Sequence, residues 1–280
     1  MLSRVLVIGG TGYLGSELSL KLTSAGITVK SASNSNRADY SVDLKNPVNL
    51  VSIVNQFKPD LILNLASHGL GGNVIEAELI INSKGPSLII ESIQNSNHKN
   101  CRFIHFASTL EYGVDNTFES KYAESKSVGT NCLISNGGVR YENTSILFMN
   151  NIYGARQPIN RLFRAVVKNI KSNEEIVLNF PNRQRDFCFE NEVIEVISGL
   201  LLNEKCNDEV ITIGTGGSVS VLEFVEEIFS QIAANKTTIK PRFNPANDIF
   251  EKSPKSNENY QFIKCAIDYK EGIGRALAEL

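Results

Sequence analysis

The sequence predicts an α/β fold, in which a doubly wound parallel sheet carries a small C-terminal lobe, and three observations support this prediction. Short apolar runs such as residues 5–8 and 61–65 alternate with amphipathic stretches through the first half of the chain. These runs are apolar on both faces, which is typical of strands buried between two layers of helices. The second half is less regular and contains a polar stretch, residues 236–261, with three prolines. This stretch is predicted to form a loop or a small lobe over the sheet.

The elements follow one another in the order expected of such a sheet. In the first half, strands are predicted at residues 5–8, 28–32, 61–65, 103–107 and 144–149. Helices are predicted at residues 13–25, from Pro47, at 74–94 and around 122–126, Pro47 being well suited to a first helical position. In the second half we predict a helix at 159–171, strands at 175–178 and 209–213, and a helix whose first turn is capped by Ser220 and Glu223.

Composition restricts the class of protein. The 280 residues are 42% hydrophobic and 21% charged, as in folded proteins, and a net charge of −2 without a basic run argues against nucleic acid as a partner. The apolar runs are too short to span a membrane, and no signal segment precedes the first strand, so a cytoplasmic location is expected. Five scattered cysteines without a CxxC pair, and three histidines without ligand spacing, predict reduced thiols and no metal site.

The first strand runs into a glycine-rich segment, Gly9-Gly10-Thr11-Gly12-Tyr13-Leu14-Gly15. Both the G-x-x-G-x-x-G and the G-x-G-x-x-G spacings fit it, and it lies between a predicted strand and a predicted helix, as such a loop requires. Glycines there permit a tight turn and let a pyrophosphate approach the helix N-terminus closely. The segment predicts a Rossmann-type dinucleotide-binding domain whose cofactor contacts are Gly9, Thr11, Gly12, Tyr13, Leu14 and Gly15.

The end of the second strand bears on the choice between NAD and NADP. An acid about 20 residues beyond the glycines binds the ribose 2′-hydroxyl of NAD, whereas an arginine accommodates the 2′-phosphate of NADP. Here Ser33, Asn34 and Arg37 occupy that region, and the first acid is Asp39. We therefore expect NADP as the cofactor, with NAD as the alternative.

A tyrosine and a lysine four residues apart, Tyr122 and Lys126, lie in a predicted helix and so share one face. An ammonium held beside a phenol favours the phenolate and lowers the pKa of the tyrosine towards the working range. Such a pair can exchange a proton with a hydroxyl or a carbonyl. By itself the spacing also fits an ordinary solvated helix, so its weight depends on the other motifs.

With these motifs the chain resembles the extended short-chain dehydrogenase/reductases, the NAD(P)-dependent sugar-nucleotide epimerases, dehydratases and reductases. The resemblance covers most of the chain. Beside the glycine loop it rests on Asp43-Leu44, Leu65-Ala66-Ser67, Asn82, Ser108 four residues before Tyr112-Gly113, Tyr122 with Lys126, Asn151, and Arg185-Asp186-Phe187. It implies that the cofactor site also includes Asp43, Leu44, Leu65, Ala66, Ser67 and Asn82.

The resemblance implies roles as well. Ser108 would hydrogen-bond the substrate oxygen, Tyr122 would shuttle the proton, and Lys126 would lower the pKa of the tyrosine and hold the nicotinamide ribose. Asn151 would lie in the substrate-side turn, Arg185 would contact the diphosphate of a nucleotide-sugar substrate, and a homodimer is expected. The predicted domains are residues 1–157 for NAD(P) binding, with 187–215 returning to it, and 158–186 with 216–280 as the substrate-binding lobe.

Three functions stay open. The leading prediction is NADPH-dependent reduction of a 4-keto group on a nucleotide-activated deoxysugar, with Tyr122 as the acid/base. The alternative is an NAD-dependent 4-epimerase of a nucleotide sugar, and the third is a non-catalytic NADP-binding sensor or scaffold. Elimination is disfavoured because Thr109 and Leu110 stand where dehydratases of this family carry an acid pair. Glu111, one place later, is expected on the opposite side of the strand.

Overall fold

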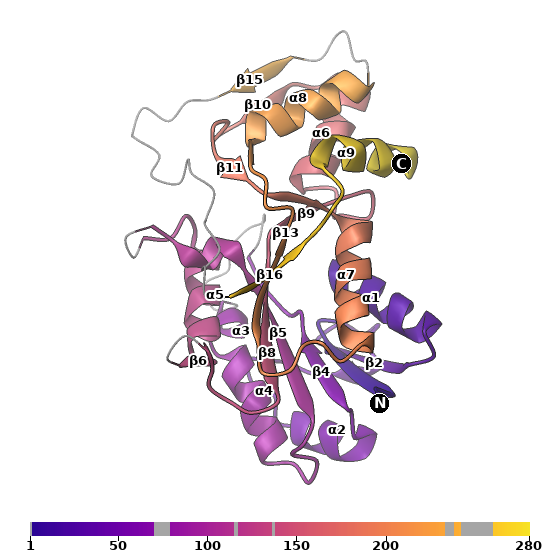
Figure 1. The fold of residues 1–280 in the computed structure, drawn as a ribbon, viewed down its shortest axis with the longest axis vertical. Helices are drawn as coiled ribbons and strands as arrows, with labels where there is room; N and C mark the ends of the chain where they lie inside the picture. The colour runs from indigo at the N-terminus through magenta and orange to yellow at the C-terminus, as the bar shows by residue number, and fades with distance from the viewer. Residues whose placement is uncertain (1, 70–78, 115–116, 136–137, 233–237, 242–259) are drawn as a thin grey trace.

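An eight-stranded parallel sheet forms the centre of the protein in the computed structural model, which describes residues 2–69, 79–114, 117–135, 138–232, 238–241 and 260–280 (Figure 1). In spatial order its strands are β16 (Gln261–Lys264), β13 (Val210–Gly214), β8 (Thr144–Met149), β5 (Arg102–Ser108), β4 (Leu61–Asn64), β1 (Arg4–Ile8), β2 (Thr28–Ser33) and β3 (Tyr40–Ser41). Neighbouring strands in this sheet pair in parallel. The strand order reverses at β1, from which β2 and β3 extend the sheet on one side and β4 to β16 extend it on the other.

Helices cover both faces of this sheet. On one face α1 (Tyr13–Ser24) packs against α7 (Glu190–Leu202); the other face carries α2 (Leu50–Phe57), α3 (Ile80–Ser83), α4 (Gly85–Gln94) and α5 (Lys121–Asn131) (Figure 1). Alternation along β1 explains the two cores, because Val7 packs with Leu18 of α1 whereas Leu6 packs with Leu50 of α2. These four side chains are fully buried. Burial of each stabilises the fold by about 1.5–3 kcal/mol.

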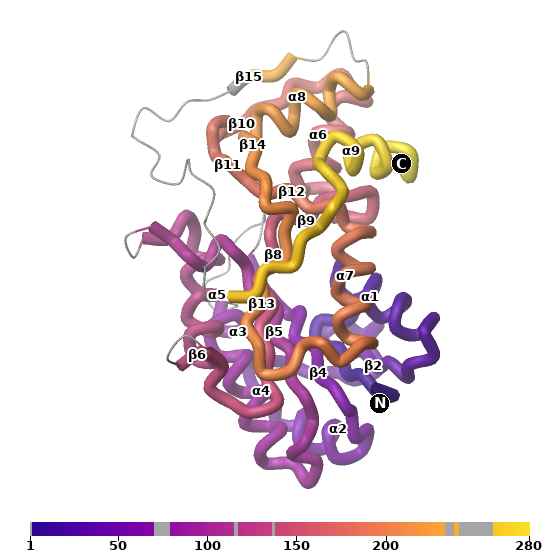
Figure 2. Tube along the Cα trace, in the orientation of Figure 1, coloured from indigo at the N-terminus to yellow at the C-terminus, as the bar shows by residue number. Residues whose placement is uncertain are grey.

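A smaller lobe lies beyond the carboxyl ends of the strands, and the C-terminal chain runs into it from β16 (Figure 2). It holds α6 (Leu162–Lys171), α8 (Val221–Ile232), α9 (Tyr269–Ala278) and the strand pairs β9 (Asn151–Tyr153) with β12 (Phe187–Phe189), β10 (Ile176–Leu178) with β15 (Ile239–Pro241), and β11 (Gln184–Arg185) with β14 (Val219–Ser220). A hairpin, β6 (Ile134–Ser135) with β7 (Gly138–Val139), follows α5. Aromatic rings form the separate core of the lobe: Phe187 stacks on Phe224 with 3.8 Å between ring centroids, and Tyr153 meets Phe224 edge-on at 4.9 Å.

The predicted fold class is confirmed, and three predicted helices are corrected. The helix expected at 159–171 begins at Leu162, with Arg161 as its N-cap. The helix expected from Pro47 begins at Leu50, because the carbonyl of Pro47 accepts a tight-turn bond from the Leu50 amide at 3.0 Å before the regular helical bonds begin. The helix expected at 74–94 is two helices, α3 and α4, over its described part, and its first residues, 74–78, lie outside the described residues. Pro86 explains the break, because it has no N–H to continue the helical ladder.

The predicted capping box at the start of α8 is confirmed. The Ser220 amide donates to a Glu223 carboxylate oxygen at 2.7 Å, and the Glu223 amide donates to Ser220 Oγ at 3.1 Å. The predicted domain boundaries stay a prediction; β16, which lies in the range 216–280 assigned to the lobe, pairs with β13 in the main sheet. No helix within the described residues has the length and apolar character needed to cross a membrane.

Candidate active site

A cavity of about 660 Å³ opens where the strand order of the sheet reverses, beyond the carboxyl ends of β1 and β4. Ligands of open α/β sheets bind at this kind of switch point. The cavity extends from the glycine loop after β1 to α5 and into the lobe. Of the residues predicted from the sequence, its lining includes Gly9, Thr11, Gly12, Tyr13, Leu14, Gly15, Ser33, Asn34, Asp43, Leu44, Leu65, Ala66, Ser67, Ser108, Tyr122, Lys126, Asn151 and Arg185. The fold therefore gathers side chains from the start and the middle of the chain around one space.

The glycine loop is shaped for close backbone contact. Gly9 has a positive φ of 80°, and a Cβ there would lie 2.6 Å from the amide nitrogen of Ala66. A Cβ on Gly15 would lie 2.4 Å from the carbonyl oxygen of Gly9, so the loop and the first turn of α1 touch directly. Gly12 is the N-cap of α1 and offers no side-chain cap, which leaves first-turn amides of the helix for another acceptor. These features fit the pyrophosphate of a dinucleotide.

The end of β2 carries hydroxyl and amide groups next to the loop. Ser33 and Asn34 line the cavity, and Ser33 Oγ lies 3.0 Å from Thr11 Oγ1. Asp39, the first acid beyond β2, is held by Lys30 at 2.7 Å and is not among the residues of the cavity lining within the described chain. Arg37 is exposed and the structure does not bring it to the lining either. The two lining residues at the end of β2, Ser33 and Asn34, are therefore uncharged.

Asn82 is the other predicted cofactor residue that the structure places outside the cavity lining. Its side chain is buried, accepts from the His68 amide at 2.9 Å and donates to the His68 carbonyl at 2.8 Å. It also donates to Ser125 Oγ at 2.9 Å. Asn82 thus fastens the segment after β4 to α5, the helix that carries Tyr122, and its observed contacts are structural.

Tyr122 and Lys126 lie one turn apart on α5 and are both buried, at 5% and 2% exposure. Burial raises the pKa of Tyr122 above its ordinary value, and the Glu111 carboxyl adds to this, whereas the Arg161 guanidinium and a hydrogen bond from Ser67 oppose it. The expected lowering of the pKa of Tyr122 by Lys126 is therefore not found, because burial outweighs the Arg161 guanidinium and the Ser67 hydrogen bond. The phenol is held in its protonated form.

Lys126 reaches behind the cavity wall. Its Nζ donates to the Phe106 carbonyl at 2.5 Å and lies 3.5 Å from Nε2 of His105. Burial lowers the pKa of Lys126, and the Glu111 carboxyl opposes that shift. His105 is packed inside the core, where burial and then Lys126 lower its pKa well below the ordinary value, so its imidazole is neutral.

Ser108 and Glu111 meet in a turn that sequence reasoning missed. The chain leaves β5 after Ser108 and forms a 3₁₀ turn, η2 (Thr109–Tyr112), with Ser108 as its N-cap. Glu111 therefore does not lie across a strand from Ser108, as expected, but folds back so that its Oε1 accepts from the Ser108 amide at 2.6 Å. The signal was available, since a serine followed three residues later by a glutamate is a capping-box pattern.

The lobe contributes an arginine pair that meets a carboxylate, Glu119, just before α5. Arg185 donates to Oε2 of Glu119 at 2.5 Å, and Arg183 lies 3.7 Å from the same oxygen while its guanidinium covers the Phe180 ring. Arg185 and Glu119 both line the cavity, as does Arg161, the N-cap residue of α6. Glu119 and Arg161 belong to no motif noted in the sequence, so only the fold could place them at the site.

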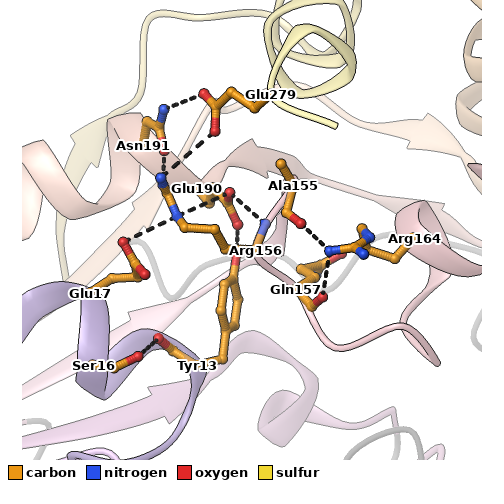
Figure 3. Close-up of polar contacts among 10 residues, drawn as sticks. All are labelled: Tyr13, Ser16, Glu17, Ala155, Arg156, Gln157, Arg164, Glu190, Asn191 and Glu279. Carbon is orange, nitrogen blue, oxygen red and sulfur yellow. Dashed lines mark hydrogen bonds and ion pairs between the residues drawn. The ribbon is translucent and has the colours of Figure 1, made fainter.

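A second polar cluster joins the glycine loop to the lobe, as Figure 3 shows. The Tyr13 hydroxyl donates to the buried carboxylate of Glu190, at the start of α7. Arg156 donates its backbone amide to Glu190 at 3.0 Å, and its guanidinium lies 3.5 Å from Glu190 and 3.1 Å from Glu17 of α1. The same guanidinium lies 3.7 Å from Glu279, near the C-terminus. Glu190 thereby links Tyr13 to Arg156, which in turn contacts Glu17 and Glu279.

A glycine loop at the switch point of a parallel sheet, with a buried tyrosine and lysine across the same cavity, defines a dinucleotide-binding α/β enzyme. Within the described residues, no group of three or more histidine, cysteine, aspartate or glutamate side chains is arranged to hold a metal ion. The model of the NAD dependent epimerase/dehydratase family matches residues 5–214, and the chain belongs to this family. It is an NAD(P)-dependent oxidoreductase or epimerase of the extended short-chain dehydrogenase/reductases, as the sequence predicted.

Two curated relatives cover most of the chain. GDP-6-deoxy-D-talose 4-dehydrogenase of Aggregatibacter actinomycetemcomitans is 26% identical over 254 residues, 85% of this chain and 82% of the relative. The dTDP-6-deoxy-L-talose 4-dehydrogenase (NAD(P)(+)) of Kitasatospora kifunensis is 21% identical over 257 residues, 82% and 79% of the two chains.

Among solved structures, Thermotoga maritima UDP-glucose 4-epimerase with UDP-glucose has a TM-score of 0.78 at 19% identity, covering 98% of this chain and 97% of that one. Bordetella bronchiseptica WbmG with NAD and UDP has a TM-score of 0.79 at 19% identity, covering 99% and 94%. These two structures are similar in fold.

Proposed function

We propose that this protein catalyses the NADPH-dependent reduction of a 4-keto group on a nucleotide-activated deoxysugar, with Tyr122 as the acid/base. The observation that carries the proposal is the cavity, which joins an end of β2 bearing Ser33 and Asn34 in place of an acid to Ser108, Tyr122 and Lys126. The names of the two curated relatives support it, since both act at the 4-position of a nucleotide-linked 6-deoxysugar. Reduction of a 4-keto group is the reverse of a 4-dehydrogenase reaction.

The site residues have distinct roles in this proposal. The glycine loop and the side chains of Ser33 and Asn34 hold the dinucleotide, which when bound supplies hydride to the carbonyl carbon. Ser108 orients the substrate oxygen, and Tyr122 donates the proton to that oxygen. Because burial raises the pKa of Tyr122, its proton is present at neutral pH and available for donation.

The lobe end of the cavity suits the nucleotide diphosphate. Arg185 is buried at 7% exposure and lines the cavity, and a guanidinium can bind a phosphate in a bidentate manner. Asn151 lies nearer the sheet in the same lining, where it can donate to the sugar. The diphosphate must share Arg185 with Glu119, which holds that arginine by an ion pair.

An NAD-dependent 4-epimerase is the alternative, and the fold it shares with UDP-glucose 4-epimerase is compatible with it. An epimerase retains NAD and returns the hydride to the same sugar, so it consumes no cofactor. A non-catalytic sensor has no chemical need for Ser108, Tyr122 and Lys126 together, and we place it third. Cofactor consumption therefore separates the first two functions.

The test supplies GDP- and dTDP-linked 4-keto-6-deoxyhexoses with NADPH or NADH and follows loss of the reduced-nicotinamide absorbance. We expect stoichiometric oxidation of NADPH, slower use of NADH, and turnover at least about 100-fold lower in the Tyr122→Phe variant with nearly unchanged cofactor affinity. Tyr141→Phe, outside the cavity lining, is the matched control. Full activity of Tyr122→Phe would refute the mechanism. Interconversion of nucleotide sugars at the 4-position without net cofactor use would establish the epimerase instead.

The homodimer and the cytoplasmic location stay predictions. Size-exclusion chromatography with light scattering measures the mass in solution directly, and a monomer at micromolar concentration would contradict the dimer.

A further inference from the structure

Glu111 is a buried carboxyl directly behind the cavity, and the roles assigned above do not use it. It is 5% exposed and lies in η2, whose N-cap is Ser108. One carboxylate oxygen, Oε1, accepts from the Ser108 amide at 2.6 Å. The other, Oε2, is buried and has no partner at hydrogen-bond distance within the part of the chain that the structure describes. The Thr130 side chain on α5 also acts on this carboxyl and lowers its pKa. A capping bond alone would need only one oxygen and no charge, so the second oxygen requires another explanation.

The positive charge that acts on Glu111 is the ammonium group of Lys126. The turn η2 packs against α5, which carries Lys126, and the lysine is itself only 2% exposed. The polar contacts of Lys126 Nζ are the Phe106 carbonyl at 2.5 Å and the neutral ring of His105 at 3.5 Å, and neither carries a negative charge. A buried ammonium without a counter-charge is costly and tends to lose its proton. Glu111 supplies the missing negative charge.

The structure assigns Glu111 as a positioning residue, which holds the Ser108 backbone with one oxygen and provides a counter-charge for the buried Lys126, from behind the cavity wall. This inference rests on the proposed function for the roles of Ser108, Tyr122 and Lys126. Glu111 is not in the cavity lining and does not touch the substrate in this arrangement. Glu111 therefore acts on the reaction indirectly, through Ser108 and Lys126.

The charge of Glu111 affects the pKa values of two residues in the cavity lining, Lys126 and Tyr122. Burial raises the pKa of Glu111 and lowers that of Lys126, and each of the two opposes the shift of the other. Glu111 also raises the pKa of Tyr122, after burial, while Arg161 on the lobe side lowers it. His105 is neutral. Removing the charge of Glu111 therefore lowers the pKa of both Lys126 and Tyr122. Both groups act in their protonated forms during reduction, so the alkaline limb of the pH profile moves to lower pH.

The test compares the pH dependence of turnover in the wild type and in Glu111→Gln, which keeps an oxygen for the Ser108 amide but removes the charge. We expect the profile to move by about one pH unit or more to lower pH, as loss of an opposite charge at close range does. Glu124→Gln is the matched control, because Glu124 is an exposed glutamate on α5, the helix that carries Lys126. Glu111→Asp keeps the charge and should retain the wild-type profile.

A second charge-free variant, Glu111→Leu, suits a buried apolar site and is used if Glu111→Gln folds poorly. The pH dependence of the NADPH dissociation constant, measured without substrate, should move in the same direction, because Lys126 is proposed to contact the nicotinamide ribose. If Glu111→Gln or Glu111→Leu folds and both profiles coincide with the wild type, the inference is wrong. Wild-type protein that neither reduces nor epimerises any substrate would instead refute the proposed function, and the binding profile would still test the inference.

Discussion

Replacing Glu190 by glutamine tests how strongly the glycine loop is tied to the rest of the molecule. Glu190 is 1% exposed and accepts hydrogen bonds from the Tyr13 hydroxyl and from the Arg156 amide at 3.0 Å. The Arg156 guanidinium completes the set at 3.5 Å. Burial and then Glu190 raise the pKa of Tyr13 far above its ordinary value, so its phenol remains a donor at any working pH. Glutamine preserves the shape of the side chain and removes its charge.

The expected loss of stability is about 2–3 kcal/mol. A hydrogen bond to a charged group contributes about 1.5–3 kcal/mol and a neutral one about 0.5–1.5, so each of the three contacts weakens by about 1 kcal/mol. The cost stays below the 3–5 kcal/mol of a broken buried ion pair, because Arg156 is 39% exposed and keeps Glu17 and Glu279 as partners. The charge of Glu190 thus matters mainly because it strengthens the hydrogen bonds that the carboxylate accepts.

Urea unfolding followed by circular dichroism measures this loss as a lower midpoint at unchanged m-value. Glu195→Gln is the matched control, because Glu195 lies on the same helix and also contacts α1, through Lys21, but is 63% exposed. That variant should lose no more than about 1 kcal/mol. The double variant Tyr13→Phe with Glu190→Gln should lose less than the sum of the two single variants. A loss below about 0.5 kcal/mol for Glu190→Gln would refute the reasoning.

Two further predictions concern pH. Ser67→Ala removes the hydrogen bond that lowers the pKa of Tyr122. Sugar oxidation requires the Tyr122 phenolate, so the corresponding limb of the kcat profile should move to higher pH. A limb that does not move would contradict the contact. The second prediction concerns Asp39 at the sheet edge. Burial raises the pKa of its carboxyl, but hydrogen bonds from Lys30 and Ser31 outweigh burial and lower that pKa from 3.8 to about 2. A depressed folded-state pKa stabilises the fold above pH 4, and this contribution is lost as the pH falls towards 2. Asp39→Asn should therefore cost stability at pH 6, by no more than about 1 kcal/mol because the pair is exposed, and nothing near pH 2; urea midpoints at both pH values decide it.

Local patterns in the sequence predicted most of the sheet and part of the site, because they depend on backbone requirements that act over a few residues. Gly9 has a positive φ and a Cβ on Gly15 would meet the Gly9 carbonyl oxygen, so both requirements for glycine arise within the loop itself. The spacing of Tyr122 and Lys126 likewise fixed their common face on α5. The start of the helix after Pro47 was misplaced because a tight turn and a first helical turn share the same local signals.

Only the tertiary structure determined the environments of these residues. Tyr13 and Glu190 meet across 177 positions of the sequence, and Glu119 and Arg161 reach the cavity lining through folding alone. The sequence by itself determined that a dinucleotide loop and a Tyr–Lys pair are present. Whether Tyr122 holds or releases its proton was decided by burial against nearby charges, since desolvation and Coulomb interactions depend on distances that no local pattern contains.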